Sequence, residues 1–114
     1  MEKANYENLD VFIRSHQVVL VIYRLIENFP TTQQYLISAQ ILRSASSIPA
    51  NIAEGFGRYT IKEKIRFLYI SRGSSEETKY HLMLAKDLKL ISNDKYQELY
   101  TELTEIVKML NGLI

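Results

Sequence analysis

The sequence predicts an all-α protein, an antiparallel up-down four-helix bundle whose second helix is kinked at a proline. Four stretches of the 114-residue chain place apolar residues three and four positions apart, which is the period of a helix with one buried face. The connections between these stretches are short, and no stretch shows the signals of a strand. Short connections favour antiparallel neighbours, so we expect a single domain spanning residues 1–114.

The first helix is expected to begin near Asn8 or Asp10, either of which can cap it, and to run to about Asn28. Phe29-Pro30 then ends it, and an irregular stretch over residues 31–37 leads to the next helix. Apolar residues cover more of this helix than one core face needs. The predicted core face consists of Leu9, Phe12, His16, Val19, Tyr23 and Ile26.

The second helix is expected to run from a cap at Ser38 to Gly55–Gly57, because glycine can take the left-handed conformation that closes a helix. Pro49 lies inside this helix and removes one backbone hydrogen bond. The apolar spacing nevertheless keeps its register from Ala45 to Ile52, which favours one kinked helix. The alternative is two short helices, with Pro49 at the first position of the second.

The third helix starts at a capping-box pattern, Thr60-Ile61-Lys62-Glu63, and is expected to be about 29 residues long. Gly73 interrupts it, which predicts a close contact with another backbone. Ser92 is expected to cap the fourth helix.

Charge is distributed unevenly along the chain. The formal net charge is only +1, but residues 43–72 carry six basic and two acidic side chains, a local excess of +4. Cations interleaved with Tyr59 and Tyr69 suit RNA, where charges meet phosphates and rings stack on bases. The plainer interpretation is the solvated start of a helix. The candidate nucleic-acid patch consists of Arg58, Lys62, Lys64, Arg66 and Arg72.

Polar residues also occupy helical faces otherwise filled with small or apolar groups. We predict that they form a buried hydrogen-bonded layer between the second and third helices, with a partner such as Arg43, Arg58 or Asn51 for Glu77. The layer consists of Arg43, Asn51, Glu54, Ser74 and Glu77. The alternative is an acid–base site made by Glu54, Glu77 and His81, although no spacing in the sequence predicts that they converge.

Other classes of site lack their signatures. The chain has no cysteine, no Glu-x-x-His pair of the di-iron type and no phosphate-binding glycine loop, so we expect no metal and no cofactor. The first ten residues lack the apolar core of a secretory signal, and the apolar run Val18–Tyr23 is too short to cross a bilayer. We therefore expect a cytoplasmic protein.

Some apolar residues exceed what one bundle seam can cover, and such surplus usually marks an interface. The candidate oligomer contacts are Val18, Val21, Ile22, Tyr100 and Val107. We therefore expect the chain to associate with copies of itself.

One motif in the second helix is highly specific, Ser47-Ile48-Pro49-Ala50-Asn51-Ile52-Ala53-Glu54-Gly55. Matching residues elsewhere are Leu9, Tyr23, Phe29-Pro30, Arg43, Ala45, Arg58, Phe67-Leu68, Gly73-Ser74, Glu77 and Leu82. With these residues the chain resembles the 23S rRNA-intervening sequence proteins (S23 ribosomal protein-like), four-helix bundles first associated with insertions in bacterial large-subunit rRNA genes. Phe12, Ser71 and Lys89 depart from the family pattern, where Trp, Ala and a helix-closing Gly are usual.

The resemblance implies an up-down bundle without enzymatic activity that assembles as a ring-like homo-oligomer, a homopentamer in known members. Related accessory proteins of diversity-generating retroelements are basic pentameric bundles thought to contact nucleic acid and a reverse transcriptase. Two hypotheses follow for this chain. It contacts RNA or DNA through basic patches that the ring repeats, or it is a structural or adaptor module that acts only through protein partners.

Overall fold

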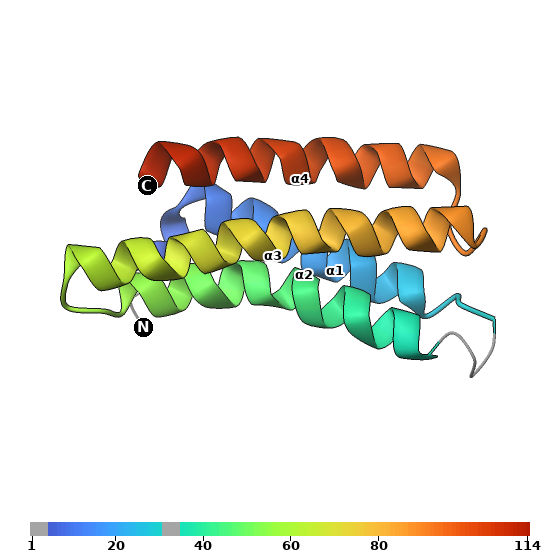
Figure 1. The fold of residues 1–114 in the computed structure, drawn as a ribbon, viewed down its shortest axis with the longest axis horizontal. Helices are drawn as coiled ribbons and strands as arrows, with labels where there is room; N and C mark the ends of the chain where they lie inside the picture. Colours follow the sequence, from blue (N-terminus) through green and yellow to red (C-terminus); the bar gives the residue numbers. More distant parts are fainter. Residues whose placement is uncertain (1–4, 31–34) are drawn as a thin grey trace.

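Four helices make up the fold, in a computed structural model that describes residues 5–30 and 35–114. None of these residues lies in a strand, which confirms the all-α class. In Figure 1 the helices lie along the 44 Å axis of the molecule, and the chain colours run along α1 and α3 in one direction and along α2 and α4 in the other. A short 3-10 helix, η1 (Asn5–Asn8), precedes α1 (Asp10–Ile26), α2 (Tyr35–Phe56), α3 (Ile61–Asp87) and α4 (Asn93–Leu113).

The core is one cluster of buried apolar residues to which all four helices contribute. Among its largest fully buried members are Ile22 of α1, Ile48 of α2, Leu82 of α3 and Leu103 of α4. α2 packs most extensively on α3, so the second and third helices form the central pair of the bundle. No helix in the described ranges is both long and apolar enough to span a bilayer.

α1 buries a different face from the predicted one. Its fully covered residues are Val11, Ser15, Val18 and Ile22, whereas Leu9, Phe12, Val19 and Ile26 pack only at the edge of the core and His16 and Tyr23 are exposed. Apolar residues surround this helix, so spacing alone could not distinguish its faces. The predicted cap was also wrong, because the extended N-cap residue is Leu9, which has no capping side chain.

α2 is one continuous helix through Pro49, so the two-helix alternative is wrong. It begins at Tyr35, which makes residues 35–37 helical where an irregular stretch was expected; residues 31–34 lie outside the described ranges. Its end is not closed by a left-handed glycine either, because no described glycine has a positive φ. Instead the backbone N–H of Gly57 donates to the carbonyl of Ala53 at 3.1 Å.

The close approach expected at Gly73 occurs at Gly55. A Cβ on Gly73 would meet nothing within 4 Å, since this residue is exposed on α3. A Cβ on Gly55 would lie 3.1 Å from both the carbonyl oxygen of Lys64 and the Cβ of Phe67. The absence of a side chain at Gly55 therefore lets the end of α2 pack directly on the backbone at the start of α3.

The predicted starts of α3 and α4 are confirmed. The hydroxyl of Thr60 accepts from the backbone N–H of Glu63 at 3.1 Å, and that of Ser92 accepts from Lys95 at 3.0 Å. α3 ends at Asp87, and Lys89, two residues later, has a φ of 63° in the left-handed region. The residue that stands in place of the usual glycine thus adopts the conformation that glycine favours.

Candidate nucleic-acid interface

The connection between α2 and α3 forms one end of the molecule, which we call the tip and define as residues 54–69. In Figure 1 the tip extends along the long axis beyond the C-terminal end of α4. Four of the five predicted patch cations lie on it, against two carboxylates. The tip therefore carries a net charge of +2.

Three of the four cations of the tip lie over aromatic rings. The guanidinium carbons of Arg58 and Arg66 each lie 4.6 Å from the centroid of the Phe67 ring, and the Nζ of Lys64 lies 4.9 Å from that of Phe56. Each such contact at an exposed site contributes about 0.5–1 kcal/mol. The rings thus restrict where these long side chains place their charge.

Two carboxylates partly neutralise the tip. Arg58 Nη2 lies 3.0 Å from Glu54 Oε1, and Arg66 Nε lies 2.9 Å from Glu63 Oε2. The hydrogen bond from Arg66 lowers the pKa of Glu63, with further lowering by the charge of Arg66 and of the nearby cations. Lys62 forms no ion pair within 4.0 Å with any residue in the described ranges and is exposed, although its charge contributes to lowering the pKa of Glu63.

Arg72 lies at the margin of this group. Its Nη1 donates to Asn111 Oδ1 of α4 at 2.7 Å, and its guanidinium carbon lies 4.7 Å from the centroid of the Tyr69 ring. The structure therefore brings Arg58 and Arg66 together around the Phe67 ring, whereas Arg72 lies over a different ring, that of Tyr69, and is bonded to α4.

The predicted polar layer is partly correct. Arg43 pairs with Glu77 across α2 and α3, which confirms one of the expected partners. The burial is wrong for the charged members, because the side chains of Arg43, Glu54 and Glu77 are 56%, 56% and 41% exposed. Long side chains reach past the helix contact into solvent, where their charges keep part of their hydration.

Short hydroxyl side chains fill the place where the charged layer was expected. Ser44 and Thr78 share a hydrogen bond of 2.9 Å, as do Ser47 and Ser74, and Ser71 donates to the carbonyl of Ile48 at 2.9 Å. We call this set, together with Asn51, the hydroxyl seam. Asn51 Nδ2 donates to the carbonyl of Ser47 at 2.7 Å, and Ser74 is 8% exposed. The signal missed in the sequence is the three- and four-residue spacing of Ser71, Ser74 and Thr78.

His81 borders the hydroxyl seam. Its Nδ1 lies 3.1 Å from Ser44 Oγ, and its Nε2 lies 3.9 Å from Glu77 Oε2. Burial lowers the pKa of His81, the Glu77 carboxylate opposes this, and Arg43 lowers it further. The order Ser–His–Glu is that of a catalytic triad, but Ser44 is 0% exposed, so its hydroxyl cannot meet a substrate in this structure.

The acid–base alternative also required Glu54 near Glu77, and the structure does not bring them together. Glu54 pairs with Arg58 on the tip, whereas Glu77 pairs with Arg43, which lies eleven residues earlier in α2 than Glu54. That separation is roughly 16 Å along a helix. The two carboxylates therefore belong to different regions of the central helix pair.

Two of the candidate oligomer contacts belong to the core instead. Val18 is 2% exposed and Ile22 is 0% exposed, because both lie on the face that α1 turns toward the bundle. Val21 and Val107 are half-buried, and Tyr100 is 40% exposed beneath the Nζ of Lys79 at 4.8 Å from the ring centroid. The apolar residues exposed on α1 are Ile13, Leu20 and Tyr23.

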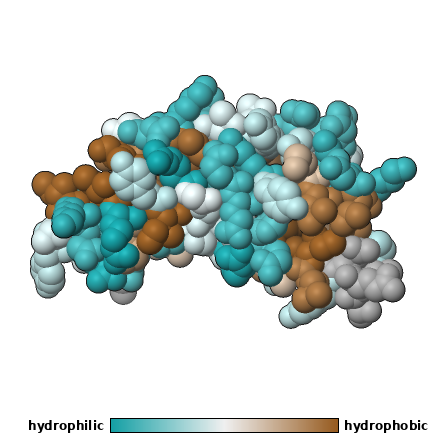
Figure 2. Space-filling model, in the orientation of Figure 1, coloured by the Kyte–Doolittle hydropathy of each residue, from teal (hydrophilic) through white to brown (hydrophobic). Residues whose placement is uncertain are grey.

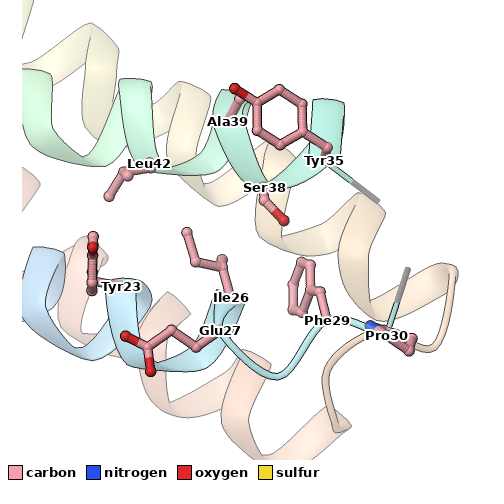
Figure 3. A pocket seen from close by; sticks show the side chains of 9 residues that line it. All are labelled: Tyr23, Ile26, Glu27, Phe29, Pro30, Tyr35, Ser38, Ala39 and Leu42. Carbon is pink, nitrogen blue, oxygen red and sulfur yellow. The ribbon is translucent and has the colours of Figure 1, made fainter. Parts of the chain in front are cut away.

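An apolar groove of about 870 Å³ lies at the other end of the molecule. Figure 3 shows Tyr23 and Ile26 of α1 opposite Ala39 and Leu42 of α2, with Phe29 beside them. On the face drawn in Figure 2, apolar surface lies toward both ends and a hydrophilic band crosses the middle. The tip and the groove therefore lie at opposite ends of the molecule, and both ends expose apolar side chains, at the tip those of Tyr59 and Ile61.

Comparison with known proteins identifies a family and a related fold. Residues 7–112 match the family model described as 23S rRNA-intervening sequence protein. A similar solved structure is the 1.70 Å crystal structure of a protein with unknown function from the S23 ribosomal protein family of Bacteroides thetaiotaomicron VPI-5482. It is 31% identical, superposes with a TM-score of 0.84, and the match covers 91% of this chain and 97% of that one. No functionally curated protein matches the chain.

Proposed function

The chain belongs to the 23S rRNA-intervening sequence protein family, and we propose that it is a non-enzymatic, homo-oligomeric four-helix bundle that contacts RNA or DNA through repeated copies of its cationic tip. The proposed assembly is a ring-like pentamer in the cytoplasm that needs no cofactor. The family membership supports the bundle, and the chemistry of the tip supports the ligand.

The observation that carries this proposal is the excess of exposed cations on the tip. Arg58, Lys64 and Arg66 are restrained over aromatic rings, and Lys62 has no ion pair in the described part of the chain. Phosphate contacts of this kind displace counterions from nucleic acid, so binding falls steeply as salt rises. One protomer offers few charges, and a ring multiplies them into avidity.

The proposal takes residues 1–114 as a single antiparallel up-down bundle in which α2 bends at Pro49. The exposed apolar residues Ile13, Leu20 and Tyr23 of α1, with Tyr100 of α4, supply surface for contacts between copies. Light scattering at micromolar concentration is expected to give five times the 13.3 kDa of the chain. A particle of 13.3 kDa only would contradict the oligomer.

The test of nucleic-acid contact is a charge reversal on the tip. A variant carrying Lys62→Glu, Lys64→Glu and Arg66→Glu should bind structured RNA at least about tenfold more weakly at low salt, because three phosphate contacts become repulsive. The matched control carries Arg24→Glu, Lys95→Glu and Lys108→Glu, which change the net charge equally outside the tip. Circular dichroism and light scattering must show that both variants remain folded and oligomeric.

Two results would count against the proposal. Equal binding by the natural chain and the tip variant would discard the patch. No binding by the natural chain at low salt would favour the second function, a structural or adaptor module that works through protein partners. The apolar groove beside Phe29 and Tyr35 supports that alternative, since grooves of this composition suit protein side chains.

A further inference from the structure

A shallow hollow of about 430 Å³ lies on the outer side of the first turns of α3. Its lining residues recur at helical spacing and all come from α3. In Figure 1 the start of α3 extends along the long axis beyond the C-terminal end of α4. The lining consists of Lys62, Glu63, Ile65, Arg66 and Tyr69.

The hollow combines an aromatic wall with charged edges. Tyr69 is 48% exposed, and the guanidinium of Arg72 lies over its ring. Ile65 is half-buried and adds aliphatic surface beside the ring. Arg72 covers one face of the ring, so a flat ligand group would stack on the other face.

The charge around the hollow favours an anion joined to that flat group. Arg66 Nε lies 2.9 Å from Glu63 Oε2, which leaves the other guanidinium donors of Arg66 and the exposed Lys62 to meet an anion. Glu63 also presents carboxylate oxygens that accept hydrogen bonds. The edge of the hollow therefore carries a negatively charged acceptor beside positively charged donors. A phosphate next to a planar ring with amino or hydroxyl groups matches this arrangement.

We propose that the hollow holds one unpaired nucleotide of a single-stranded RNA or DNA, with its base on the Tyr69 ring and its phosphate at Lys62 and Arg66. This inference rests on the proposed function and adds a preference for single strands to it. A base inside a duplex is covered by neighbouring bases on both faces, so its ring cannot reach Tyr69. Both single strands qualify, because base and phosphate are common to RNA and DNA.

The experiment compares Tyr69→Leu with the natural chain by fluorescence anisotropy on three probes of equal length. The probes are a non-self-complementary RNA strand, the DNA strand of the same sequence and the RNA duplex. Leucine keeps apolar bulk and removes the stacking ring, so binding of both single strands should weaken roughly 5- to 100-fold. Duplex binding should remain unchanged, because it depends on phosphate contacts alone.

Tyr80→Leu is the matched control, since Tyr80 is 54% exposed on the same helix and lies outside the hollow. It should leave all three affinities unchanged. An equal loss on single strands and duplex, or no loss on any probe, would overturn the hollow as a nucleotide site. The proposed function would still stand if the tip charge reversal abolished binding.

Two further outcomes separate the inference from what it rests on. If the natural chain binds none of the probes at low salt, both the proposed function and the nucleotide site are wrong. If Tyr69→Leu changes the mass of the oligomer in light scattering, the hollow is a contact between copies and the nucleotide site is overturned. An unchanged mass together with a selective loss of single-strand binding is the result expected of the proposal.

Discussion

The same two helices, α2 and α3, meet in different ways at the hydroxyl seam and at the tip. In the seam the polar side chains are short, and Ser44, Ser71 and Thr78 are fully buried. On the tip the polar side chains are long, exposed and held over aromatic rings, as for Arg58 and Arg66. Side-chain length thus determines whether a polar group on this helix pair serves packing or remains available to a ligand.

The two regions also differ in how their polar atoms are satisfied. Within the described ranges, every buried side-chain nitrogen and oxygen has a hydrogen-bond partner, so the seam has no spare donor to offer. The tip carries more cations than carboxylates, and its ion pairs are exposed and contribute little to stability. Substitutions in the seam should therefore change the free energy of unfolding, whereas substitutions on the tip should mainly change binding.

Overpacking the seam should have the largest effect. Ser71→Leu places a larger side chain at a fully buried position and removes the hydrogen bond to the carbonyl of Ile48. We expect the free energy of unfolding to fall by about 2–4 kcal/mol, measured by urea denaturation. Ser46→Leu, on the exposed side of α2, should change it by less than about 0.5 kcal/mol. Similar losses in the two variants would contradict the distinction between seam and surface.

Removing one hydroxyl without changing side-chain shape should cost less. Thr78→Val deletes the group that lies 2.9 Å from Ser44 Oγ and 2.8 Å from the carbonyl of Ser74. The free energy of unfolding should fall by about 1–2 kcal/mol, because buried partners lose a hydrogen bond. Thr104→Val removes the exposed hydrogen bond from the Thr104 hydroxyl to the carbonyl of Tyr100 on α4, and it should leave the free energy of unfolding nearly unchanged. Equal free energies of unfolding for the two variants in urea denaturation would show that the hydroxyl of Thr78 adds no stability.

The close packing of the end of α2 on the start of α3 can be tested by substituting two glycines. Gly73→Ala should stabilise the protein by about 1 kcal/mol, because alanine favours helix and nothing lies within 4 Å of the new Cβ. Gly55→Ala should lose or reverse that gain, since its Cβ would lie 3.1 Å from backbone and Cβ atoms of α3. An equal gain at both positions in thermal denaturation would mean that α3 moves away from Gly55 without cost.

Local signals in the sequence predicted much of the fold. Thr60 and Ser92 cap helices because their hydroxyls accept from backbone donors three residues later, an interaction that depends only on nearby residues. The continuity of α2 through Pro49 followed from the apolar register on both sides of the proline. Features that depend only on residues within one or two helical turns could therefore be predicted from the sequence alone.

Features that depend on the neighbouring helix were not readable in this way. Val18 and Ile22 face the core because of how α1 sits against the bundle, and the apolar residues on its other sides gave equally regular spacings. The exposure of Glu54 depends on its position near the end of α2, where it pairs with Arg58 in solvent. Likewise, the sequence does not show that Gly55 rather than Gly73 meets another backbone.

The smallest expected effect concerns pH at the edge of the seam. Burial lowers the pKa of His81, with Arg43 lowering it further and Glu77 opposing them. The unfolded chain therefore binds a proton more readily than the native one, so stability should fall as pH drops through about 6.5 and level off below the native pKa. The effect should be modest, because the hydroxyls of Ser44 and Thr78 can turn toward Ile41 and Ser74 carbonyls when Nδ1 becomes a donor. His81→Gln should flatten the dependence between about pH 7.5 and pH 5.5 in urea denaturation, and His16→Gln, on the exposed side of α1, should retain it. If the free energy of unfolding changed equally with pH in the natural chain and in the His81→Gln variant, protonation of His81 would not affect stability.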